Sequence, residues 1–133
     1  MIALAPKDRN YGISTPVFSE GKVRMSAGQD PDSGSGRGAA YSINPAKRGD
    51  LTGSGKVWQY EKIDRSISTA AVGNGLAFLS DMDGILHWLD VKTGKPYWTF
   101  DLKSPVWGRE GEITISSHRH RVAIRAPKLL LRL

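Results

Sequence analysis

The sequence predicts an all-β chain made of short antiparallel strands, with an internal repeat. Fifteen glycines and seven prolines in 133 residues are typical of a chain with many turns. Residues 66–101 alternate between short apolar runs and glycine-containing turns, which is the pattern of a β-meander. A less regular copy of the same pattern lies between residues 10 and 65.

The better-patterned copy predicts one sheet of four strands. Its first turn is Asn74-Gly75, and Asn-Gly favours a tight hairpin because both residues tolerate positive φ. Glycine turns at 81–84 and 91–94 separate the next runs. We expect Trp98 to be largely buried and no helix in this region. The expected strands lie near 68–72, 76–80, 85–90 and 95–101.

The earlier copy aligns with this one at two different offsets. Ser14–Gly21 matches Ser68–Gly75 at an offset of 54, whereas Lys56–Glu61 matches Pro96–Asp101 at an offset of 40. The difference of 14 residues predicts insertions in two polar, glycine-rich loops, since surface loops tolerate added length at little cost. These loops are residues 28–38 and 44–55. The expected strands lie near 14–18, 22–27, 39–43 and 56–61, with Trp58 equivalent to Trp98.

One motif in the better copy has a recognisable spacing. Asp90, Thr93, Gly94 and Trp98 resemble the pyrroloquinoline quinone (PQQ)-like repeat signature, Ala-x-Asp-x-x-Thr-Gly-x-x-x-Trp, with Trp88 in place of the Ala. In the first copy Asn44 stands for the Asp, and Thr52 and Gly53 lie one residue too far from Trp58. We expect structural roles for all of these motif residues. The Asp and Gly form a turn, and the Trp docks on the adjoining sheet.

The resemblance implies a partial β-propeller of about two four-stranded antiparallel blades with an atypical C-terminal tail. We expect an N-terminal segment at 1–9, the first blade at 10–65, the second at 66–108 and a basic tail at 109–133. The tail lacks the turn residues of the repeat: Ile115 stands where a turn glycine is expected, and Ala123-Ile124 replaces Asp-Gly. The repeat therefore ends near Gly108, and a diverged cap strand is the alternative for the tail.

The similar families include quinoprotein dehydrogenases, a lipoprotein subunit of the outer-membrane assembly machinery and bacterial sensor domains. The resemblance implies a non-catalytic binding or scaffold module of a periplasmic or other extracytoplasmic protein, with other blades or a protein as partner. Two open blade faces predict self-association, because large exposed apolar surfaces tend to associate in water. The alternative is a fragment of a PQQ-dependent dehydrogenase whose catalytic residues lie outside this chain. Flanking sequence with a cysteine pair or calcium ligands would favour that alternative.

No catalytic, cofactor or metal residues are predicted. The dehydrogenase family holds PQQ with a vicinal cysteine pair and Ca²⁺, but the chain has no cysteine. PQQ and Ca²⁺ are therefore expected only under the alternative. Asp30–Gly36 fails the EF-hand spacing, and Gly53–Lys56 lacks the outer residues of a phosphate loop. His118 and His120 alternate with arginines and lack a carboxylate partner.

Charge and hydropathy exclude several other classes. The net charge is +6, but residues 109–133 carry six basic and two acidic residues, so most of the excess lies in the tail. A tail-confined excess does not predict a folded nucleic-acid surface, and such binding would weaken steeply with salt and disappear on truncation at Gly108. No apolar stretch is long enough to span a membrane. The first residues lack a basic n-region and a full apolar h-region, so we do not expect them to act as a signal peptide.

Overall fold

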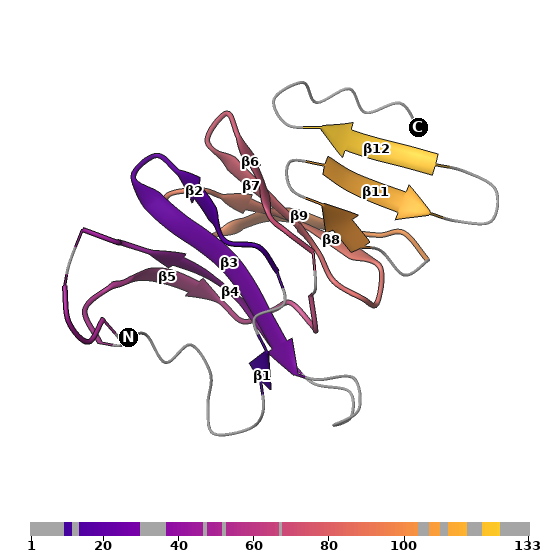
Figure 1. Cartoon of the computed structure of the whole chain (residues 1–133). Coiled ribbons are helices and arrows are strands. Elements are labelled where there is room, and N and C mark those ends of the chain that lie inside the picture. The colour runs from indigo at the N-terminus through magenta and orange to yellow at the C-terminus, as the bar shows by residue number, and fades with distance from the viewer. Residues whose placement is uncertain are drawn as a thin grey trace.

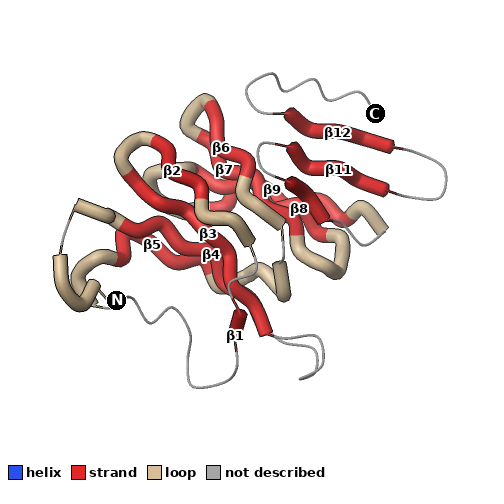
Figure 2. The backbone as a smooth tube through the Cα atoms, in the orientation of Figure 1, coloured by secondary structure: helices blue, strands red, loops and turns tan. Residues whose placement is uncertain are grey.

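Twelve β-strands in three antiparallel sheets make up the described part of the chain (Figures 1 and 2). The computed structural model describes residues 10–11, 14–29, 37–46, 48–51, 53–66, 68–103, 107–109, 112–116 and 121–125. These residues contain no helix, and hence none with the length and apolarity of a membrane span. The all-β class predicted from the sequence is confirmed.

The middle sheet is the predicted four-stranded meander. Its strands pair in the order of the chain. The first turn has positive φ at Asn74 (53°) and Gly75 (77°), as a tight hairpin that follows the strand twist requires. Residue 67 lies outside the described part, and the other residues of 66–101 contain no helix. The strands are β6 (Ala71–Gly73), β7 (Leu76–Ser80), β8 (Ile85–Asp90) and β9 (Pro96–Asp101).

The first sheet contains the second predicted set of four strands. β3 pairs with β2 on one edge and with β4, and β4 pairs with β5. A short strand that the sequence did not predict, β1 (Asn10–Tyr11), also pairs with β3. The predicted strands are β2 (Val17–Ser19), β3 (Lys22–Gln29), β4 (Gly38–Ile43) and β5 (Lys56–Tyr60).

The strand registers show that the two sheets are copies of one unit. The hairpin pair Val17 and Arg24 corresponds to the pair Ala71 and Phe78, at an offset of 54. The offset falls to 46 across the β3–β4 loop and to 40 across the β4–β5 loop, so the two predicted loops contain the insertions. Each outer strand has a bulge immediately before its tryptophan. Trp58 and Trp98 therefore occupy equivalent positions, as predicted.

A third sheet follows the repeat. Its strands β10, β11 and β12 pair antiparallel in that order. The second hairpin joins strands of five residues each, whereas β10 has three. The tail thus continues the antiparallel pattern, although it lacks the turn signature of the repeat. The bounds are Trp107–Arg109, Glu112–Ser116 and Arg121–Arg125.

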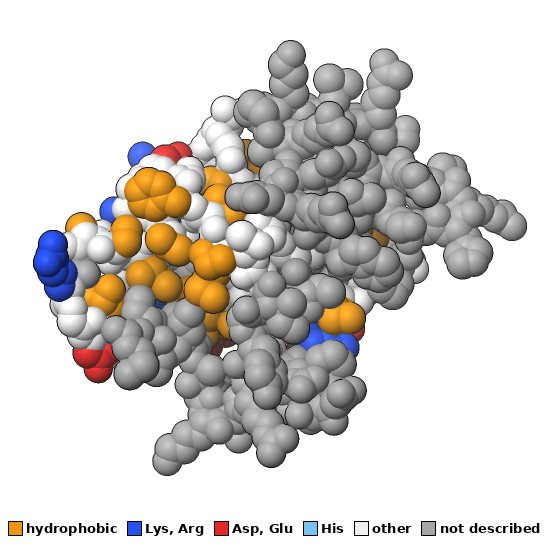
Figure 3. All heavy atoms as spheres, in the orientation of Figure 1, with side chains coloured by type: hydrophobic (Ala, Val, Ile, Leu, Met, Phe, Trp, Pro, Cys, Tyr) orange, Lys and Arg blue, Asp and Glu red, His pale blue; other side chains and the backbone are white. Residues whose placement is uncertain are grey.

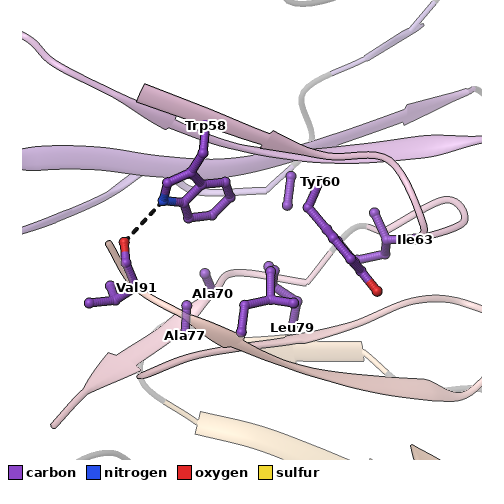
Figure 4. Packing of buried hydrophobic residues seen from close by; sticks show 9 residues of the cluster. Trp58, Tyr60, Ile63, Ala70, Ala77, Leu79 and Val91 are labelled. Carbon is purple, nitrogen blue, oxygen red and sulfur yellow. Dashed lines mark hydrogen bonds between the residues drawn. The ribbon is translucent and has the colours of Figure 1, made fainter. Parts of the chain in front are cut away.

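The main apolar core lies between the first and middle sheets (Figure 4). Trp58 and Tyr60 from β5 pack over small and branched residues of the middle sheet, including Ala77, Leu79 and Leu89. Leu89 is completely inaccessible to solvent. Each sheet therefore uses one face for this shared core. The space-filling view shows further hydrophobic side chains gathered over the first sheet (Figure 3).

The expectation that Trp98 is largely buried is wrong. Its side chain is 39% exposed, whereas Trp58 is 8% exposed. Both residues lie at the same position of an outer strand, so the strand itself does not cause the difference. Trp58 is covered by the middle sheet, whereas more of the Trp98 side chain remains exposed to solvent. The burial of this tryptophan depends on the neighbouring sheet and not on its own.

Candidate functional site: the contact between the two sheets

The turn after β8 is built around the Asp90 carboxylate. One oxygen accepts hydrogen bonds from the Lys92 amide (3.0 Å), the Thr93 amide (2.7 Å) and the Thr93 hydroxyl (2.8 Å). The other oxygen accepts from the Tyr97 hydroxyl (3.1 Å). These bonds, led by the one from the Thr93 hydroxyl, lower the pKa of Asp90, because they favour the ionised form. The Asp-x-x-Thr-Gly motif thus folds as a turn, with positive φ at Gly94 (70°).

The Trp58 indole packs against this turn. Its Nε1 donates a hydrogen bond to the Val91 carbonyl at 3.0 Å (Figure 4). A Cβ on Gly94 would lie 2.6 Å from Cδ2 of the indole, which is well inside van der Waals contact. Only glycine therefore allows this close approach. The motif of the second copy receives the tryptophan of the first.

The first copy of the motif has different surroundings. Thr52 lies outside the described residues, and Gly53 is exposed with open space where its Cβ would stand. The Asn44 amide donates to the Gly55 carbonyl at 2.8 Å, and the Asn44 side chain accepts from the Ala46 amide at 3.2 Å. The asparagine therefore keeps the role of the Asp in the turn. Gly53 lacks the close aromatic contact of Gly94.

A buried arginine reinforces the contact between the sheets. Arg24 is 3% exposed. It donates to the Ser19 carbonyl at 2.7 Å and to the Val91 carbonyl at 3.3 Å, so Val91 accepts from both Trp58 and Arg24. Burial lowers the pKa of Arg24, and the charge of Glu20 partly opposes this effect. Sequence reasoning missed Arg24, because an isolated arginine on a strand is normally exposed.

A chain of three polar side chains crosses the interface. The Tyr60 hydroxyl lies 3.1 Å from Nδ1 of His87, and Nε2 of His87 lies 2.9 Å from the Asp81 carboxylate. Since a carboxylate only accepts, Nε2 of His87 donates to Asp81, and the Tyr60 hydroxyl group is the hydrogen-bond partner of Nδ1. Burial, followed by the charge of Asp81, raises the pKa of Tyr60. All three side chains are at most 6% exposed.

Buried serines bond the segments that lead into the two sheets. Ser26 Oγ donates to the Ser68 carbonyl at 3.1 Å, and Ser66 Oγ donates to the Ser80 carbonyl at 2.6 Å. Ser14 Oγ donates to the Ser26 carbonyl at 2.6 Å. Small hydroxyl side chains let these segments approach each other while their polar groups remain paired. These bonds join β3 to the segment before β6, and that segment to β7.

No metal site can be built from the described residues, which contain no group of three or more His, Cys, Asp or Glu side chains. The Asp30–Gly36 loop and the pair His118 and His120 lie outside those residues. Residues 53–55 form a turn that leads into strand β5, so no helix N-terminus faces it. A hollow of about 240 Å³ on the first sheet includes Tyr41, Arg37 and Glu61. Its lining provides no recognisable catalytic pair.

The outer face of the middle sheet presents an aromatic ladder. Phe78, Trp88 and Trp98 are cross-strand neighbours, and consecutive ring centroids are 4.5 Å apart. Phe100 extends the ladder with an edge contact to Trp98 at 6.1 Å. Trp98 and Phe100 are 39% and 46% exposed. By register, this ladder corresponds to the face of the first sheet that packs on the middle sheet.

The chain shares its architecture with a europium-containing methanol dehydrogenase. The superposition has a TM-score of 0.52 at 18% identity and covers 75% of this chain and 19% of the other. The first and middle sheets are blades of a β-propeller. A curated relative, 1-butanol dehydrogenase (cytochrome c) from Thauera butanivorans, is 30% identical over 95 residues.

The chain covers only a small part of the length of each similar protein. The aligned part is 70% of this chain but 13% of the Thauera protein. No family model matches the sequence. The chain therefore spans less than one fifth of either similar protein. Below, the first sheet is called blade 1 and the middle sheet blade 2.

Proposed function

We propose that the chain is a non-catalytic blade pair of a larger propeller and that its outward aromatic face docks a further blade. The observation that carries this proposal is the equivalence of Trp58 and Trp98. Trp58 is seated on the turn of the next blade, whereas Trp98 presents the same kind of face and is 39% exposed. A propeller covers each blade with the next one. The partner that fits the Trp98 face is thus another blade with a tight Thr-Gly turn.

The small share of the relatives that this chain spans supports the same proposal. With 13% and 19% of their lengths covered, most of a comparable propeller would be supplied from outside the described blades. Repeat architectures generally need about three units before stacking offsets the entropy of ordering the chain. The resemblance to extracytoplasmic repeat proteins supports a periplasmic parent protein.

A dehydrogenase fragment is the second candidate function. It is favoured by the names of the two similar proteins, which are both alcohol dehydrogenases. The described residues do not fit a PQQ and Ca²⁺ site, because they supply no cluster of acidic ligands and the sequence has no cysteine pair. A quinone-dependent activity would rely on residues beyond those described, so no catalytic step is assigned to this chain.

Titration of the full chain with PQQ, with and without Ca²⁺, separates the two candidates. We expect no saturable signal by calorimetry or absorbance at micromolar concentrations. Ethylenediaminetetraacetate treatment before the titration removes carried-over metal and serves as a control. Saturable micromolar binding would make the dehydrogenase fragment the leading function.

Sedimentation velocity tests whether the Trp98 face is adhesive. The full chain should self-associate with rising concentration, and Trp98→Lys should reduce this association, because a lysine ammonium is costly to bury. Phe18→Lys is the matched control, since Phe18 is a more exposed aromatic (69%) outside the ladder. If Trp98→Lys and Phe18→Lys both self-associate as strongly as the wild type, the Trp98 face has no adhesive role.

A further inference from the structure

The polar chain Tyr60–His87–Asp81 is buried where the two blades meet. In a buried interface, a polar atom left without a partner costs far more than a satisfied bond gains. His87 is 3% exposed and Asp81 is 1% exposed, so water does not readily replace a missing partner. A residue without a hydroxyl group at the position of Tyr60 would leave Nδ1 of His87 unsatisfied.

The other copy of the repeat carries different residues at the positions of Tyr60 and His87. By strand register, Tyr60 of blade 1 corresponds to Phe100 of blade 2. His87 corresponds to Tyr41. The outward face of blade 2 therefore presents a phenyl ring where the outward face of blade 1 presents a phenol. Both faces carry an aromatic ring at this position, but only the ring on blade 1 has a hydroxyl group that needs a hydrogen-bond partner.

We propose that residues 60 and 100 form a pairing code that sets the order of blades. Tyr60 selects a neighbour with a histidine at the position of His87. Phe100 selects a further blade with an apolar residue at that position, and it rejects a second copy of blade 2. The inference rests on the proposed docking role of the Trp98 face, since it names the chemistry of the partner that docks there.

Both mismatched combinations leave a buried polar group unpaired. Phe100 against a histidine would orphan one ring nitrogen, and a tyrosine against an apolar residue would orphan a hydroxyl group. Phe100 already contacts Trp98 edge-on, so a docked blade would enclose both rings together. Specificity of this kind arises from the penalty on the wrong partner and not from extra affinity for the right one.

A duplicated blade tests the code within the full chain. A second copy of residues 66–103 is inserted between Lys103 and Ser104, so that the inserted copy of His87 faces Phe100. Four variants combine Phe100 or Phe100→Tyr with the inserted histidine unchanged or replaced by His87→Leu in the inserted copy only. The equilibrium constant for unfolding is measured in urea for all four. Phe18→Tyr, which adds a hydroxyl group at an exposed aromatic, is the control.

The code predicts that the two substitutions are coupled. Phe100→Tyr should stabilise the variant with the inserted histidine and destabilise the variant with the inserted leucine, with a coupling of about tenfold in the unfolding constant. Phe18→Tyr should have the same small effect in both backgrounds. If Phe100→Tyr has equal effects beside histidine and leucine, the code is overturned.

A separate readout distinguishes failure of the code from failure of docking. Fluorine NMR of 5-fluorotryptophan, assigned with Trp98→Phe, reports whether the inserted blade covers Trp98. A shifted, solvent-protected Trp98 resonance without coupling would refute the code and leave the docking proposal standing. A resonance unchanged by the insertion in all four variants would refute both.

Discussion

Gly94 and Trp58 approach so closely that a Cβ on the glycine would lie 2.6 Å from the indole. Gly94 also has a positive φ of 70°. Gly94→Ala therefore introduces backbone strain and a clash across the blade interface. Gly75 has a similar φ of 77°, but open space surrounds the position of its Cβ. The two glycines separate the cost of the backbone conformation from the cost of the contact.

We expect Gly75→Ala to lower the free energy of unfolding by about 1–2 kcal/mol, the usual cost of left-handed backbone at a non-glycine residue. Gly94→Ala should lower it by about 2 kcal/mol more, because the added methyl overpacks the interface. Urea unfolding followed by circular dichroism measures both. Equal losses in the two variants would show that Trp58 does not depend on Gly94.

The two equivalent tryptophans should contribute unequally to stability. Trp58 is 8% exposed and Trp98 is 39% exposed. Trp58→Ala removes a side chain packed between the blades and should cost about 3–5 kcal/mol. Trp98→Ala should cost about 1–2 kcal/mol, since much of its surface already faces solvent. A larger loss for Trp98→Ala than for Trp58→Ala in urea unfolding would contradict the packing of Trp58 between the blades.

Local signals explain why so much of the fold was predictable. Asn74-Gly75 marks a hairpin through its own backbone preferences, and the observed positive φ values agree. The Asp90 turn is equally local, because its carboxylate bonds the amides two and three residues ahead. Such features depend on neighbours in sequence. They need no knowledge of how the sheets pack.

The parts that sequence reasoning missed depend on distant residues. The exposure of Trp98 follows from what stands beside its sheet, so the strand pattern alone gave the wrong expectation. The bond between Tyr60 and His87 joins residues 27 positions apart, and no spacing rule connects them. Arg24 reaches Val91 across 67 positions. One signal was available: Asp81 and His87 lie six residues apart in one blade, on the two sides of a tight turn.

Removal of the Tyr60 hydroxyl group should destabilise the chain. Tyr60→Phe leaves Nδ1 of the buried His87 without its hydrogen-bond partner, which should cost about 1–2 kcal/mol of unfolding free energy. Tyr97→Phe is the matched control, because the Tyr97 hydroxyl bonds Asp90 at the exposed surface and its loss should cost less than about 0.5 kcal/mol. Urea unfolding of both variants provides the comparison. Similar losses would show that the buried Tyr60–His87–Asp81 hydrogen bonds contribute no more to stability than the exposed bond of Tyr97.

The Asp90 turn should make stability depend on pH in acid. Its hydrogen bonds, led by that from Thr93, hold the pKa of Asp90 below its ordinary value of 3.8. A carboxyl whose pKa is lower in the folded state stabilises the fold above that ordinary value, and the contribution disappears as pH falls through the folded pKa. Asp90→Asn keeps an acceptor for the turn but cannot titrate, so it should flatten this acid dependence.

Asp101 requires a parallel control, since its hydrogen bond with the Lys103 side chain also lowers its pKa. The urea midpoint should be measured between about pH 5 and pH 2 for the wild type, Asp90→Asn, Asp101→Asn and the double variant. Each single variant should lose part of the wild-type slope below about pH 4, and the double variant should lose more than either. Because the Asp90 carboxylate accepts four hydrogen bonds, its variant should show the larger change. An unchanged slope in Asp90→Asn would mean that the motif aspartate shapes the turn without coupling its charge to folding.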